Sequence, residues 1–320
     1  MATATAVTVK KTSRALVRFA WAVVGYNVLV ILWGALVRAT GSGAGCGNHW
    51  PLCNGQVIPL SPRVDTMIEF THRCMTGGSI FVVLGLLVWT FRATVKGQAA
   101  RVFAVASTVL LVNEAFLGAL LVKLGYVTGN QSMGRVVVLS IHLSNTLLLL
   151  AALTLTARLL GTGQPWRELG VGGAKKVWAF VGLAATLVVG VSGSLAALGD
   201  TLFPASSLRA AFAQDFAEGS PWLLRLRGVH PVSAMVAAIF VLWLVGQARR
   251  AGAARLAGLV LALLGFQFAL GLADVLLLAP VWMQILHLLG ADLYWVALMT
   301  LAAVVVWPRA GVISVKPAWN

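Results

Sequence analysis

Eight apolar stretches, each long enough to cross a lipid bilayer, limit what this chain can fold into more than any other feature. About 20 residues of helix span a hydrocarbon core of about 30 Å. Helices satisfy all their backbone hydrogen bonds within that core, where no water is available. We therefore predict an all-α integral membrane fold whose spans cover 17–39, 67–91, 101–123, 136–160, 176–198, 226–248, 254–276 and 281–306.

The balance of residue types supports a lipid environment. Hydrophobic residues make up 59% of the chain and charged residues 10%, whereas soluble domains carry about a quarter charged residues. The net charge of +15 would also suit a nucleic-acid partner. However, the basic residues lie mostly between the apolar stretches, and no basic stripe is interleaved with aromatic residues. We expect the lipid bilayer as partner and no nucleic acid.

The basic residues also predict the topology. Sixteen of the 24 lie in the N-terminal and C-terminal segments or in the second, fourth and sixth loops, or at the span ends next to them, namely Lys10, Lys11, Arg14, Arg18, Arg92, Lys96, Arg101, Arg158, Arg167, Lys175, Lys176, Arg249, Arg250, Arg255, Arg309 and Lys316. The positive-inside rule places these segments, and both termini, in the cytoplasm. The loop with Cys46 and Cys53 then faces the outside of a cell (cytoplasmic) membrane, where a disulfide is compatible with the compartment. The first span is expected to be a retained helix, with no cleaved signal peptide.

The chain repeats itself weakly. His72 and His142 lie on the second and fourth spans, and His230 and His287 lie on the sixth and eighth. The segment around Gly118 in the third span resembles the one around Gly271 in the seventh. We predict two tandem four-helix bundles related by a parallel repeat, residues 1–165 and 166–320.

Those four histidines lie four to six residues inside the outer ends of their predicted spans, which places them in one layer of the membrane. Ionisable residues within a membrane are costly and usually mark function. Two imidazoles on facing helices can bind a haem iron from both sides, so we predict one haem-sized site in each half. Isolated interhelical hydrogen bonds, a zinc site and a proton relay are the alternatives, and none of them explains the pairing.

Other residues would suit a porphyrin. Gly118 and Gly271 would let a backbone approach the ring, or would serve tight helix packing. Arginines at the outer ends of the spans would bind propionates, or would act as ordinary interfacial anchors; they are Arg38, Arg73, Arg135, Arg225 and Arg227.

Glu69 precedes His72 by three residues on the same helix face, and the second half has no matching carboxylate. This asymmetry suggests chemistry in the first half and electron transfer in the second. An ion pair between Glu69 and Arg73 is the alternative. A di-iron site would need further Glu-x-x-His motifs, which the chain lacks. Asp274, Asp292 and the loop residue His49 receive no role.

At two places the sequence resembles the haem A synthases. The stretch GALVRATGSGAGCGNHWPLC at 34–53 is similar to their first helix and outer loop, and Glu69-Phe-Thr-His72-Arg73 is similar to their second-helix motif. The later histidines fall where that family has its own. The resemblance covers nearly the whole chain, and the first two motifs together are specific.

The resemblance implies an oxidoreductase that converts the C8 methyl group of haem O to the formyl group of haem A for cytochrome oxidase, with water as the oxygen source. It implies a resident haem b on His230 and His287, and a substrate haem facing His72 and His142. Glu69 would be the catalytic acid or base, and Cys46–Cys53 a disulfide. Haem O synthase and a quinone or other electron acceptor are the further partners that we consider.

Two other functions fit part of the pattern. A di-haem cytochrome b that oxidises quinol shares the histidines and the fold, but needs neither Glu69 nor the cysteine loop. A transporter would show helices broken by Gly or Pro at mid-membrane. Here the prolines lie mainly in loops or near span ends.

Overall fold

The structure is a computed structural model that describes residues 12–60, 62–166 and 173–307. It is all-helical, as predicted, and within the described residues eight helices are long and apolar enough to cross a membrane. The elements are α1 (Arg14–Ala39), η1 (Ser42–Ala44), α2 (Val64–Ala93), α3 (Ala99–Lys123), α4 (Met133–Thr162), α5 (Ala174–Leu202), α6 (Leu208–Phe216), α7 (Trp222–Arg225), α8 (Val229–Arg250), α9 (Ala254–Leu276) and α10 (Val281–Val306).

The predicted spans agree with these helices, apart from their ends. The last two spans match α9 and α10, and the first five start or end a few residues short. The sixth was predicted from residue 226, but α8 begins at Val229 after the short helix α7. Pro231 explains the difference: it lacks an N–H and its ring would clash with a carbonyl four residues back, so it suits only a first helical turn.

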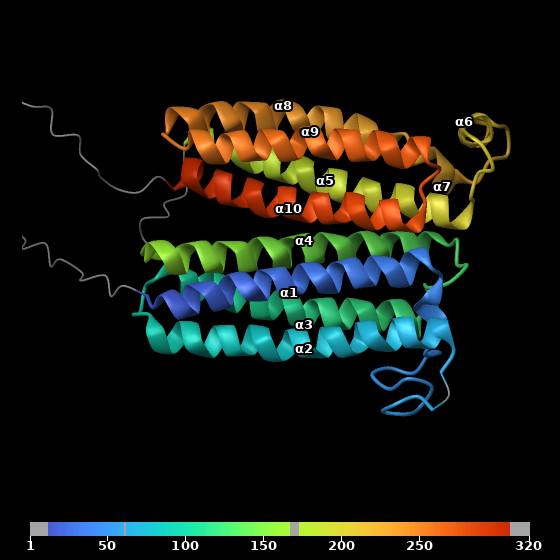
Figure 1. The fold of residues 1–320 in the computed structure, drawn as a ribbon, viewed down its shortest axis with the longest axis horizontal. Helices are drawn as coiled ribbons and strands as arrows, with labels where there is room; N and C mark the ends of the chain where they lie inside the picture. The colour runs from blue at the N-terminus through green and yellow to red at the C-terminus, as the bar shows by residue number, and fades with distance from the viewer. Residues whose placement is uncertain (1–11, 61, 167–172, 308–320) are drawn as a thin grey trace, which may run out of the picture.

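The helices form two groups that lie side by side in Figure 1. Helices α1–α4 pack on one another, as do α5, α8, α9 and α10, and the groups meet along α4, α10, α1 and α5. The buried core lies at this junction and includes Leu150 and Leu153 of α4 and Leu298 and Leu301 of α10. The grouping is consistent with the predicted halves, whereas the 165/166 boundary and the repeat relation stay predictions.

One hydrogen bond joins the two groups deep in the core. The indole Nε1 of Trp295 on α10 donates to the backbone carbonyl of Leu147 on α4 over 2.8 Å. Trp295 is almost fully buried. A buried indole N–H needs such a partner, so this bond fixes how α10 sits against α4.

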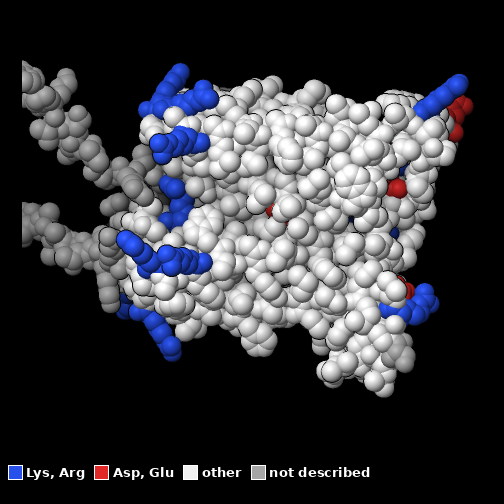
Figure 2. Space-filling model, in the orientation of Figure 1, with Lys and Arg blue, Asp and Glu red and all other residues white. Residues whose placement is uncertain are grey.

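The two ends of the bundle differ in charge (Figure 2). Most described Lys and Arg side chains gather at the end where α1 begins, which we call the basic end. At the opposite end lies the loop closed by Cys46 and Cys53, together with α6 and α7. We call this the disulfide end. Of the basic residues used to predict topology, Lys10, Lys11, Arg167, Arg309 and Lys316 lie outside the described residues.

Candidate functional site

The four histidines predicted as ligands lie on α2, α4, α8 and α10, near the disulfide end of each helix. Their spans begin at Val64, Met133, Trp222 and Val281, if α7 and α8 are counted as one span. The histidines therefore lie six to nine residues inside, deeper than predicted because most of the spans begin earlier. At about 1.5 Å per residue, these positions differ in depth by only about 5 Å.

His230 and His287 face each other within the second group of helices. Their ring centroids are 6.3 Å apart and their planes are inclined by 84°. Two imidazoles that hold one metal atom between them would have centroids about 6.2 Å apart, given metal–nitrogen bonds of about 2.0 Å and about 1.1 Å from each nitrogen to its ring centre. The observed separation is compatible with a shared metal atom, and it also lies within the range of about 4.5–7 Å that is usual for ring contacts.

The Nδ1 nitrogen of His230 has a hydrogen-bond partner that indicates the tautomer of the ring. Nδ1 lies 3.1 Å from the backbone carbonyl oxygen of Val189 on α5. Because a carbonyl only accepts hydrogen bonds, Nδ1 carries the proton and donates it. Nε2 is then the nitrogen with a free lone pair, as in metal-binding histidines whose other nitrogen donates to a carbonyl.

Each of the four histidines faces a glycine on a neighbouring helix. A Cβ atom on Gly193 would lie 2.8 Å from Cε1 of His230, and one on Gly34 would lie 3.0 Å from Cε1 of His72. The corresponding distances are 3.4 Å from Gly271 to His287 and 3.9 Å from Gly118 to His142. The sequence pointed only to Gly118 and Gly271, either for approach to a porphyrin or for tight helix packing. In the structure all four glycines lie beside imidazoles.

His72 and His142 lie on α2 and α4 of the first group. The Nδ1 atoms of His72, His142 and His287 are buried without a hydrogen-bond partner. Buried polar atoms in proteins usually have hydrogen-bond partners, so each marks a place where a bound group or a small ring shift would add one. Among the described residues, no three His, Cys, Asp or Glu side chains converge on one point as ligands of a single ion would.

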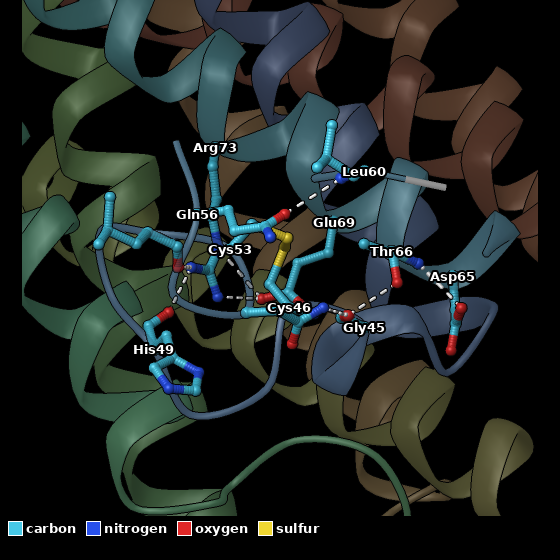
Figure 3. Close-up of a disulfide and its surroundings, with 12 residues drawn as sticks. Gly45, Cys46, His49, Cys53, Gln56, Leu60, Asp65, Thr66, Glu69 and Arg73 are labelled. Carbon is cyan, nitrogen blue, oxygen red and sulfur yellow. Dashed lines mark hydrogen bonds and ion pairs between the residues drawn. A yellow bond between two sulfur atoms is a disulfide. The ribbon is translucent and has the colours of Figure 1, made fainter. Parts of the chain in front are cut away.

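Glu69 is buried and fully paired, and it connects α2 to the disulfide loop (Figure 3). Its Oε2 accepts a hydrogen bond from the backbone N–H of Cys46 over 2.8 Å. Its Oε1 forms an ion pair with Arg73, 2.5 Å from Nη2. The ion pair considered as an alternative to catalysis is thus present, and Glu69 also holds the loop.

Arg73 also forms hydrogen bonds to this loop (Figure 3). Its Nη1 donates to the backbone carbonyls of His49 and Leu52 over 2.5 and 2.6 Å. The predicted disulfide between Cys46 and Cys53 is confirmed and closes this loop. The guanidinium of Arg73 therefore already has protein partners for Nε and both terminal nitrogens, although the sequence predicted that it binds a cofactor.

The loop packs directly on the beginning of α2. The hydroxyl of Thr66 donates to the carbonyl of Gly45 over 2.8 Å, and a Cβ on Gly45 would lie 2.5 Å from the carbonyl of Asp65. A side chain at position 45 would push the loop away from the helix. This close approach is one reason for the glycine-rich sequence that precedes Cys46.

Other arginines at the disulfide end connect helices. Arg38 donates to Thr201 on α5 and Gln284 on α10 over 3.1 and 2.9 Å, and so joins the two groups. Arg227 occupies the position three residues before His230, as Glu69 does before His72, and pairs with Asp200 at 2.9 Å. The same sequence position thus carries opposite charges in the two groups.

The two acids without an assigned role differ in burial, since Asp292 is fully buried and Asp274 only partly. Asp292 on α10 is 1% exposed, and its Oδ2 has no hydrogen-bond partner. Asp274 near the end of α9 also has one buried oxygen, Oδ1, without a partner. Within the described part of the chain, no hydrogen bond or ion pair joins either acid to the imidazoles, and both acids stay without a role.

Comparison with known proteins identifies relatives of the whole helical region. The family model for the COX15-CtaA cytochrome oxidase assembly proteins matches residues 17–299. A protohaem IX farnesyltransferase of Thermus thermophilus is 47% identical over 288 residues, which are 89% of this chain and 47% of that protein.

Two haem A synthases match shorter regions. The one from Shouchella clausii is 39% identical over 132 residues, 41% of both chains, and the one from Exiguobacterium sp. is 34% identical over 137 residues, 43% of both chains. The chain therefore spans about half the length, or less, of the curated relatives that it matches.

Proposed function

This chain belongs to the COX15-CtaA family of cytochrome oxidase assembly proteins, to which haem A synthases belong, and we propose that it is a membrane oxidoreductase that makes haem A. The reaction is oxidation of the C8 methyl group of haem O to a formyl group. The balanced half-reaction converts one methyl group and one water molecule into one formyl group, four protons and four electrons. The electrons pass to a quinone or another acceptor.

The observation that carries this proposal is the pair His230 and His287, whose ring centroids lie 6.3 Å apart, a separation compatible with two ligands of one metal atom. We assign a resident haem b to this pair. Its iron supplies redox chemistry that amino-acid side chains lack. The residues provide the position: Val189 orients His230 through Nδ1, and Gly193 gives its ring room.

The first group of helices is proposed to take the substrate. His72 and His142 would face haem O, with Gly34 and Gly118 leaving space beside their rings. Glu69 would accept or return the protons of the methyl group as a catalytic acid or base. Both present partners of its carboxylate donate to it, as an ionised carboxylate requires.

The relative from Thermus supports a connection with haem O supply. That protein is named for farnesyl transfer to protohaem, and this chain covers only 47% of its length. Farnesylated haem is the class of product that such a transfer makes. We therefore propose that haem O synthase is a partner, and that its product passes laterally through the lipid bilayer.

The proposed location is the cytoplasmic membrane, with both termini in the cytoplasm and the disulfide loop outside. The gathering of Lys and Arg at the basic end supports this orientation through the positive-inside rule.

A di-haem cytochrome b that oxidises quinol is the second candidate, because a facing histidine pair equally suits electron transfer. One experiment separates the two. The protein is expressed in a membrane that contains haem O but makes no haem A, and the pigments are extracted and identified by mass. Haem A in the extract supports the synthase. Protein that binds haem b but leaves haem O unchanged supports the cytochrome and contradicts our proposal.

A further inference from the structure

A second carboxylate, Glu114 on α3, lies beside one of the proposed ligands. Its Oε1 is 3.4 Å from Nδ1 of His142 on α4. This distance is longer than a good hydrogen bond, yet Nδ1 is buried and has no other partner. A shift of a few tenths of an ångström would give Nδ1 an acceptor.

The carboxylate of Glu114 is held in place from α4. Its Oε2 accepts from the side-chain amide of Asn145, and its Oε1 contacts the hydroxyl of Thr146. Asn145 is held in turn, because its Oδ1 accepts from Asn113 over 2.8 Å. The groups around Glu114 are donors, as an ionised carboxylate requires, since it can only accept.

The second group of helices has a neutral arrangement at the matching positions. Glu114 precedes Gly118 by four residues, and Gln267 precedes Gly271 by four. Asn145 follows His142 by three residues, and at that distance after His287 there is Gly290.

That glycine is needed for space, because a Cβ on Gly290 would lie 2.1 Å from Nε2 of Gln267. The amide nitrogen of Gln267 is buried without a partner. His142 thus has a held carboxylate beside it, whereas the matching sequence position in the second group carries a neutral amide.

We propose that Glu114 is a positioning residue for His142. Its carboxylate accepts a hydrogen bond from Nδ1–H, which leaves the lone pair of Nε2 free for the iron of the bound haem. This inference rests on the proposed function and deepens it. A carboxylate that accepts from a ligating imidazole orients the ring and makes the ligand more basic. Gln267 gives His287 no such charge.

The charge has a consequence that a packing role would not produce. A more basic ligand stabilises the oxidised iron, so the haem of the first half is harder to reduce than it would be beside a glutamine. The asymmetry between the halves is then built in at two places: Glu69 beside the disulfide loop, and Glu114 beside His142.

The test compares E114Q with wild-type protein loaded with protohaem, by redox titration followed in the optical spectrum. Loss of the carboxylate is expected to raise the midpoint potential of the first-half haem. A tenfold change in the reduction equilibrium corresponds to about 59 mV for one electron. E114D, which keeps the charge, is expected to return the potential toward the wild-type value. The spectrum of the haem on His230 and His287 reports in each variant that the protein is folded.

The outcomes separate this inference from the proposed function. If H142A leaves the first-half haem signal unchanged, His142 is no ligand and both proposals fail for that half. If H142A removes or alters the signal, but E114Q binds haem at an unchanged potential, only the role of Glu114 is overturned.

Discussion

The carboxylate of Glu69 accepts a hydrogen bond from the backbone N–H of Cys46, with 2.8 Å between Oε2 and N. Three residues along α2 from Glu69 is His72, so one turn of helix connects the disulfide loop to a proposed ligand. The same carboxylate also pairs with Arg73, which holds the far side of the loop. Glu69 therefore holds the loop through hydrogen bonds and is also the proposed acid or base.

Substitution of Glu69 by Gln should separate these two roles. The amide oxygen can still accept from Cys46, but the side chain can no longer exchange a proton. We expect haem to stay bound, while conversion of haem O falls by about 10² to 10⁴, the usual contribution of a general acid or base. The measurement is the ratio of haem A to haem O in extracted pigments.

Thr66→Val is the matched control, because it removes a hydrogen bond to the same loop without touching Glu69. It should retain most of the conversion. Normal haem A yield in Glu69→Gln would remove Glu69 from the chemistry, and an equal loss in both variants would assign it to loop fastening alone.

Replacement of His230 or His287 by Ala should abolish the low-spin optical signal of the resident haem, because one axial ligand of the pair is lost. The reduced spectrum of the purified protein measures this directly. His49→Ala is the control, since only the backbone carbonyl of His49 is used, by Arg73. A retained low-spin signal in either ligand variant would assign that haem to other residues.

Gly193→Ala should weaken binding of the resident haem without destabilising the helix. The added Cβ would lie 2.8 Å from Cε1 of His230, so the ring must move from its position. Alanine also favours helix over glycine by up to about 1 kcal/mol. We expect a lower haem content in purified protein whose unfolding temperature in detergent is not reduced.

Gly246→Ala on α8 is the control, because no atom lies within 4 Å of its added Cβ. In the first half, Gly34→Ala and Gly25→Ala on α1 form a second matched pair, with contact to His72 at 3.0 Å in the first case and none in the second. Equal haem contents within both pairs would show that the glycines do not make room for the imidazoles.

Removal of the disulfide by Cys46→Ser with Cys53→Ser should free the loop. Cross-linking a loop this short is worth about 2–3 kcal/mol in the chain-entropy account. We expect a lower unfolding temperature, with wild-type protein treated with a reductant showing the same shift. Cys74→Ser is the control, because Cys74 is exposed and unpaired. An unchanged unfolding temperature would mean that Glu69, Arg73 and Thr66 suffice to hold the loop.

Several site residues could be chosen from the sequence, because their chemistry is rare in apolar helices. The four histidines and Glu69 stand out in segments that are otherwise Leu, Val and Ala, and the family resemblance connects them to haem. Glu114 is likewise a rare acidic residue in an apolar span, but the sequence alone does not connect it to any other residue. Its neighbour His142 is 28 residues away in the chain, and only the packing of α3 on α4 brings the two side chains together.

The eight spans, and the residues near one end of the bundle, can be predicted from the amino-acid sequence, because burial in lipid depends on hydrophobicity summed along a short segment. How each helix is rotated, and which helix is its neighbour, cannot be predicted in this way. In a bilayer both the lipid-facing and the protein-facing sides of a helix are apolar, so no polar stripe reveals the buried face. The folded structure is needed to see that His230 lies next to His287, that a glycine lies beside each imidazole, and that Glu69 binds the loop. Those contacts depend on side chains from different helices fitting together within a few tenths of an ångström.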